Sequence, residues 1–106
     1  MVVKKIPETG KKFLSYEVDG NSLELNDGDT IINLKKRERD DDVHIDYSLD
    51  PFGMLINGTD GKYYAAQIDI PARKYTEEKG SDGETTRTAV PFSMDNVTLT
   101  LWELND

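Results

Sequence analysis

Cysteine is absent from this chain, and histidine occurs only once, at position 44. Without cysteine the chain forms no disulfide and no thiolate metal site, so packing and hydrogen bonds must supply its stability. A lone histidine also excludes the zinc and non-haem iron sites that need several imidazole ligands. We therefore expect no resident metal and no other cofactor.

Long hydrophobic runs are missing as well. The longest apolar stretch is Tyr63-Tyr64-Ala65-Ala66, which is far too short to span a bilayer. The first residues, with Lys4, Lys5 and Pro7, lack the apolar centre of a signal peptide. We expect a cytoplasmic protein that makes no contact with a membrane.

Positive charge is scarce, because 13 basic residues face 21 acidic ones and the net charge is −8. Such a chain repels phosphate backbones, and no basic stripe is interleaved with stacking aromatics. Nucleic acid is therefore excluded as an expected partner. The acidity fits simple solubility as well as it fits a cationic partner, so it excludes more than it indicates.

Catalytic motifs are also lacking. No glycine-rich phosphate loop and no Gly-x-Ser-x-Gly nucleophile motif occurs. His44 shares its expected strand face with Asp42, Asp46 and Ser48, but residues two apart along a strand stand roughly 7 Å apart, beyond hydrogen-bond reach. We expect no catalytic residue and no enzyme activity; the aspartates should instead raise the pKa of His44.

What the sequence does contain is period-2 alternation. Apolar Val43, Ile45, Tyr47 and Leu49 alternate with polar residues, as in a half-buried strand. The same pattern predicts further strands at about 13–19, 22–26, 30–36, 62–70 and 97–104. Leu, Ile, Val and Phe together make up 25 of the 106 residues, which is enough for a folded core.

Turn residues separate these strands at fairly regular intervals. Asp-Gly and Asn-Gly pairs, which allow the positive φ of tight hairpins, occur at 19–21, 26–29, 57–61 and 82–83. We predict a single all-β domain over residues 1–106, with seven to eight short antiparallel strands in a small sandwich or barrel. A length of 106 residues suits one core.

Residues 74–88 contain almost nothing to bury, although apolar segments flank them on both sides. A short helix at 73–79 is disfavoured because it has no cap. The segment is either a mobile surface loop or a polar hairpin that turns at Gly80–Gly83 and projects towards a neighbouring molecule.

Two other segments allow two interpretations each. Lys35-Lys36-Arg37-Glu38-Arg39 runs into Asp40-Asp41-Asp42, which is typical of a solvated, self-neutralising strand end but would also suit a docking edge. The strand at 97–104 carries Val97, Leu99 and Leu101 on one face and Trp102 on the other. It is therefore central in a two-layer packing or pressed against another subunit.

Acidic turns at 26–29 and 40–42 offer carboxylates of the kind that calcium prefers, and the two turns would form a site if they met at one end of the sandwich. The alternative is ordinary turn aspartates that accept backbone hydrogen bonds. We assign no metal ligand.

Together these patterns favour a non-enzymatic structural or protein-interaction domain that binds a protein partner or a second copy. A subunit of a larger assembly, such as a phage or prophage virion component, is a special case that suits polar arms and open strand edges. The alternative is a small carbohydrate- or ligand-binding module, with or without calcium, that uses an exposed tyrosine or Trp102.

Overall fold

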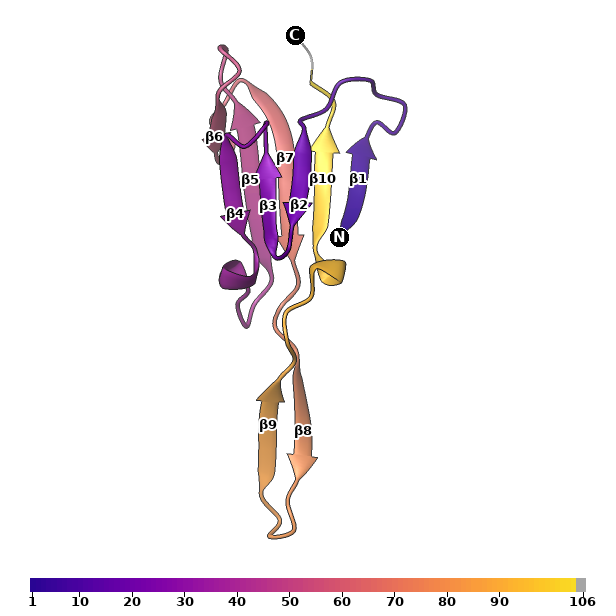
Figure 1. The fold of residues 1–106 in the computed structure, drawn as a ribbon, viewed down its shortest axis with the longest axis vertical. Coiled ribbons are helices and arrows are strands. Elements are labelled where there is room, and N and C mark those ends of the chain that lie inside the picture. The colour runs from indigo at the N-terminus through magenta and orange to yellow at the C-terminus, as the bar shows by residue number, and fades with distance from the viewer. Residues whose placement is uncertain (105–106) are drawn as a thin grey trace.

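A computed structural model describes residues 1–104 of the chain (Figure 1). Asn105 and Asp106, which the predicted domain 1–106 includes, lie outside the described residues. The strands are β1 (Val2–Ile6), β2 (Tyr16–Asp19), β3 (Ser22–Leu25), β4 (Thr30–Asn33), β5 (Val43–Leu49), β6 (Leu55–Asn57), β7 (Tyr63–Ile70), β8 (Tyr75–Lys79), β9 (Thr85–Ala89) and β10 (Thr98–Trp102). Two short 3₁₀ helices, η1 (Lys35–Arg37) and η2 (Met94–Asn96), interrupt them. The predicted all-β class is confirmed.

The strands form two facing sheets and a separate hairpin. The larger sheet has five strands in the order β1-β10-β7-β5-β6, and the smaller has three in the order β2-β3-β4. Figure 1 shows the three-stranded sheet lying across the five-stranded one. This is an open sandwich rather than a closed barrel, since each sheet keeps two free edges.

The core lies between these two sheets. Alternate residues of β3, β7 and β10 point inward and are almost completely shielded from solvent: Leu23, Leu25, Ile68, Ile70, Leu99 and Leu101. Ile45 and Tyr47 of β5 join the same cluster. The period-2 pattern in the sequence arises from this burial, because successive side chains of a strand alternate between the core and the outer face.

The structure adds two strands, β1 and β6, to the six that alternation predicts and the two of the hairpin. In β1 two adjacent lysines break the alternation, and β6 has only three residues. β1 also pairs with β10 in parallel, whereas we expected antiparallel pairs throughout. This pairing depends on backbone hydrogen bonds to a strand nearly a hundred positions away, which side-chain patterning does not encode.

β10 lies between β1 and β7, so the structure favours the two-layer interpretation of the C-terminal strand. Leu99 and Leu101 are buried in the core, and Trp102 on the opposite face is half-buried.

Residues 74–88 contribute most of a two-stranded hairpin, made of β8 and β9, that we call the arm. It turns at Gly80–Gly83, where the Gly83 N–H donates to the Gly80 carbonyl at 3.0 Å. Gly83 has a φ of 85°, which a residue without Cβ adopts freely. The arm projects from one end of the sandwich and gives the molecule extents of 64 × 25 × 23 Å (Figure 1). The hairpin interpretation therefore holds, and no helix forms at 73–79.

Candidate functional site

The arm exposes nearly all of its side chains. Every residue of β9 and four of the five in β8 are exposed, and only Tyr75 at the base is half-buried. The guanidinium of Arg87 lies 3.8 Å from the centre of the Tyr75 ring, and Glu77 stands opposite Arg87 across the hairpin. These cross-strand contacts support an arm that has no hydrophobic core of its own.

Three acidic residues from the loop after η1 hold the base of the arm; we call Glu38, Asp40 and Asp42 the arm socket. Arg73 donates from Nε to Oε1 of Glu38 and from Nη1 to Oδ1 of Asp40, each at 3.3 Å. The Tyr75 hydroxyl donates to the same Asp40 oxygen.

Backbone groups complete this attachment. The N–H of Ala72 donates to Oδ1 of Asp42 at 2.8 Å, and the N–H of Arg73 donates to the carbonyl of Arg39 at 2.7 Å. The charged run at 35–42 therefore anchors the arm within the same chain, which neither sequence interpretation anticipated. The sequence contained one signal for this attachment: the carboxylates at 38–42 are followed about 30 positions later by Arg73, at the start of the polar segment 74–88.

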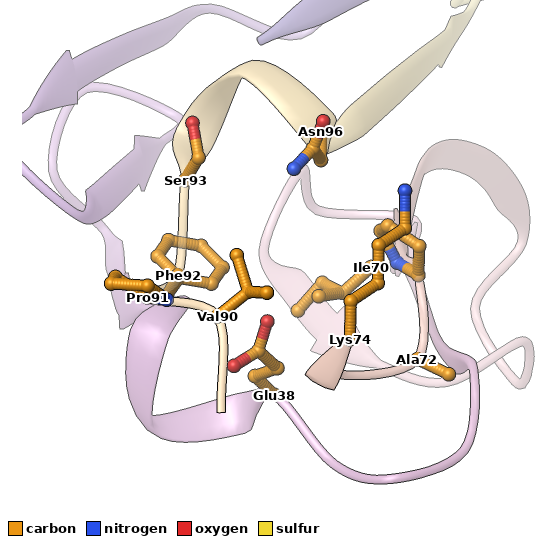
Figure 2. A pocket seen from close by; sticks show the side chains of 10 residues that line it. Glu38, Ile70, Ala72, Lys74, Val90, Pro91, Phe92, Ser93 and Asn96 are labelled. Atoms are coloured by element: carbon orange, nitrogen blue, oxygen red, sulfur yellow. The ribbon is translucent and has the colours of Figure 1, made fainter. Parts of the chain in front are cut away.

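A small cavity lies at the junction of arm and sandwich. Figure 2 shows Val90 and Glu38 facing Ile70 and Lys74 around it. Its volume of about 20 Å³ is close to that of one water position, so it is too small for an organic ligand. The junction is thus a packed joint, which the hydrogen bond from the Val90 N–H to the Lys74 carbonyl at 2.8 Å reinforces.

A network of polar side chains covers the outer face of the five-stranded sheet. His44 lies between two carboxylates: Nδ1 is 2.7 Å from Oδ1 of Asp69, and Nε2 is 2.8 Å from Oδ1 of Asp46. Gln67 donates to the other oxygen of Asp69 at 2.9 Å. The Tyr64 hydroxyl donates to Asp46. The imidazole is therefore held at both nitrogens by neighbours on β5 and β7.

The pKa of His44 is raised above its ordinary value of 6.5, as the sequence predicted. The hydrogen bond to Asp69 is the largest cause; partial burial opposes it, and the charge of Asp46 adds to it. Of the two aspartates expected beside His44, Asp46 contacts the imidazole, whereas the carboxylate of Asp42 accepts from the Ala72 N–H instead. Asp69 lies on the adjacent strand and could not be identified from sequence spacing.

In this network the pKa of Asp69 and the pKa of Tyr64 shift in opposite directions. Burial raises the pKa of Asp69, but hydrogen bonds from His44 and Gln67 outweigh it, so the net pKa is lowered. Burial, followed by the hydrogen bond to Asp46, raises the pKa of Tyr64. Both shifts favour a neutral phenol and an ionised carboxylate beside a protonated imidazole.

Ser48 makes no nucleophile pair with His44. Its hydroxyl donates to the Gly58 carbonyl at 2.9 Å and accepts from the Gly61 N–H at 2.8 Å. The side chain is buried, and a Cβ at Gly61 would approach its oxygen to 2.5 Å. Ser48 therefore fixes the loop before β7, next to the register shift between Tyr47 and Ser48.

Trp102 lies beside this polar network, with its ring 5.4 Å from the Tyr64 ring at an interplanar angle of 83°. Its indole Nε1 is buried and has no hydrogen-bond partner within residues 1–104. Tyr64 covers part of the indole and uses its hydroxyl on Asp46, so both aromatics serve contacts within the sheet.

The acidic turns do not meet. The turn at 26–29 connects β3 to β4 at the end of the sandwich away from the arm, whereas 40–42 lies at the arm base (Figure 1). Asp27 accepts from the Ser15 hydroxyl at 3.2 Å, and Asp29 accepts from the Asn26 amide at 3.3 Å. Within residues 1–104 no three His, Cys, Asp or Glu side chains are grouped so as to hold a metal ion.

An open groove runs along the edge of the sandwich between β1 and β2, and we call it the edge groove. Its volume is about 700 Å³, and its lining is residues 3–8 together with Tyr16. Sequence analysis did not identify this surface, although Lys4, Lys5, Lys11 and Lys12 already marked a basic cluster in an acidic chain.

Comparisons with protein-family models, with curated proteins and with solved structures found no match to this chain. No helix in residues 1–104 has the length and apolar character needed to cross a bilayer.

Proposed function

We propose that this protein is a non-enzymatic structural domain that joins a protein assembly through its arm. The observation that carries the proposal is an exposed hairpin, residues 75–89, held in a fixed position by the arm socket but covered by nothing. A two-stranded hairpin is only marginally stable on its own in water. Contact with a neighbouring subunit would supply the packing that the arm lacks.

The chemistry of the arm supports specific rather than indiscriminate contact. Both of its strands have an unpaired edge, because within the described part of the chain β8 and β9 pair only with each other. Charged residues such as Glu77, Glu78 and Lys79 discourage random strand addition, while the backbone remains available to a matched partner. A component of a phage or prophage virion is a special case of this proposal, since such an assembly repeats one subunit contact many times.

Hydrogen exchange along the arm tests the proposal. In the free molecule the amides of residues 75–89 should exchange fast, because little else protects them. On assembly at high protein concentration they should slow by about tenfold or more, while the amides of the buried strand β7 change little. Equal arm exchange at low and high concentration would contradict assembly of this chain with itself through the arm.

A ligand-binding module is the second candidate, and the half-buried Trp102 beside the network of His44, Asp46 and Asp69 favours it. Carboxylates and a neighbouring aromatic ring are the groups that bind sugars. Titration with glucose, galactose and N-acetylglucosamine, monitored by the indole NMR signal of Trp102, decides this candidate. A saturable shift supports it, and an unmoved signal at about 50 mM sugar, roughly fifty times a Kd of 1 mM, removes it.

A further inference from the structure

We infer that the arm of one copy docks into the edge groove of a second copy, an inference that rests on the proposed role of the arm. The groove and the arm differ in charge and match in strand length, and the groove runs along a side edge of the sandwich whereas the arm projects beyond one end (Figure 1). Each of these observations points to a head-to-tail contact between identical chains.

The edge groove exposes apolar surface that the sandwich leaves open. Val18 and Tyr16 pair directly with Leu23 and Leu25, so they share the inner face of the smaller sheet. Leu23 and Leu25 are fully buried, yet Tyr16, which lines the groove, is 37% exposed, and Val18, on the same strand but outside the lining, is 47% exposed. Ile6 lines the groove at the end of β1 and is 41% exposed, on the same sheet face as its register partner Trp102. The two sheets therefore part at this edge and leave space for another element.

Charge complementarity identifies that element. Residues 1–12 carry four lysines and one glutamate, although the whole chain has a net charge of −8. Lys4 and Lys5 line the groove itself together with one acidic residue, Glu8, which leaves the lining with a net positive charge. The outer part of the arm, residues 76–86, carries Glu77, Glu78, Asp82 and Glu84 against Lys79 alone. The acidic arm and the basic groove attract each other, and this fixes the orientation of the contact.

Free backbone edges line the groove on both sides. Among the described residues, 1–104, β1 pairs only with β10 and β2 pairs only with β3, so each leaves one edge without a neighbouring strand there. β1 has five residues, and so does each strand of the arm. An arm strand therefore has the length to add to the β1 edge. Thr76, Thr86 and Thr88 share one face of the arm and would place methyl groups against the apolar lining.

The contact must be made between molecules. The arm leaves the sandwich at one end, and β1 runs away from that end towards Pro7 (Figure 1). An arm bound by the arm socket at its base extends away from its own groove. A contact between two different surfaces of identical chains is heterologous, and it builds rings, filaments or reciprocal pairs.

Mixing two defective variants tests this contact directly. Deletion of residues 76–86 leaves the groove and removes the arm; the double variant K4E/K5E leaves the arm and reverses the groove charge. Each variant alone should be monomeric by light scattering, with a circular dichroism spectrum of a folded β-protein. Mixed together, they should form a one-to-one heterodimer, because only one arm and one intact groove remain.

Charge reversal provides the matched controls. K4E/K5E should weaken self-association about tenfold or more, whereas K35E/K36E, which changes the net charge equally on η1, should leave it within about twofold. The arm variant E78K/E84K keeps the Glu77–Arg87 pair and should restore association when mixed with K4E/K5E.

Three results would overturn the edge groove as the docking site. In the first, association is lost on arm deletion but is unchanged in K4E/K5E, which leaves the proposed role of the arm intact and contradicts only the groove. In the second, the arm-deleted protein and K4E/K5E stay monomeric when mixed. A wild-type chain that is monomeric at every concentration contradicts both the groove and self-assembly through the arm.

Discussion

Arg73 donates from its Nε to Oε1 of Glu38 at 3.3 Å, and the two residues are 35 positions apart in the chain. This ion pair joins the base of the arm to the loop that follows η1. Glu38 is the more buried partner, with a side chain only 15% exposed. The arm is thus held at its base by the body of the molecule, whereas all residues of β8 and β9 beyond Tyr75 are exposed.

Replacing Arg73 with methionine should loosen the arm and leave the sandwich intact. The change keeps the aliphatic stem but removes the hydrogen bonds to Glu38 and Asp40. Trypsin should then cut after Lys79 and Arg87 several times faster, because local opening of the arm controls access to these sites. Arg37→Met, on exposed η1, is the matched control and should cut at the wild-type rate. Equal cleavage in all three proteins would contradict the anchoring role.

The pKa of His44 should lie above 6.5 in an NMR titration, since Asp69 and Asp46 hydrogen-bond its two ring nitrogens. Asp69→Asn should lower it towards 6.5, because the largest cause of the shift is lost. Asp42→Asn should leave it unchanged, since Asp42 binds the Ala72 N–H. A wild-type value at or below 6.5 would be incompatible with the geometry of this network.

The same shift predicts how stability depends on pH. A raised pKa means that the folded state binds the proton more tightly than the unfolded chain. The contribution of His44 is therefore fully present below pH 6.5 and is lost as pH rises through the higher folded pKa. In urea denaturation, the free energy of unfolding of wild type should exceed that of His44→Gln by a larger amount at pH 5.5 than at pH 8.5. The opposite order would contradict the assignment.

Core packing predicts a clear contrast between two aliphatic residues. Leu99→Ala removes a fully buried side chain between the sheets and should lower the free energy of unfolding by about 3 kcal/mol. Ile31→Ala, at a site 63% exposed on β4, should cost about 0.5 kcal/mol or less. Urea denaturation of the two variants measures the difference, and similar losses would place the core elsewhere.

Calcium should not stabilise the protein. The turns at 26–29 and 40–42 lie at opposite ends of the sandwich, and Asp40 and Asp42 are engaged by the arm base (Figure 1). Since a bound ion raises the melting temperature by mass action, its absence gives no shift at about 5 mM calcium. A rise that saturates with calcium would show that one turn suffices for a site.

Sequence alternation located the sandwich strands where a single face is buried. It predicted strands at 43–49 and 62–70, and the structure has β5 at Val43–Leu49 and β7 at Tyr63–Ile70. The hairpin turn at Gly80–Gly83 could also be predicted from the sequence, because glycine favours positions where φ is positive, as at Gly83. β1 could not be predicted from the sequence, since Lys4 and Lys5 break the alternation at a strand that is mostly exposed.

The contacts between segments that are distant in the chain could not be predicted from the sequence. His44 meets Asp69 because β5 and β7 pair in one particular register, and Arg73 meets Glu38 because the chain returns to η1 before the arm. Register and chain path depend on the whole packing. The edge groove could not be predicted for the same reason, because it forms where the edge strands β1 and β2 of the two sheets lie apart.

The solution mass of wild type and of the protein lacking residues 76–86, measured by light scattering over a hundredfold concentration range, tests the central claim most directly. Wild type should increase in mass with concentration, and the deleted protein should remain monomeric with an unchanged β-sheet spectrum. Equal masses at every concentration would contradict the arm as the element of assembly.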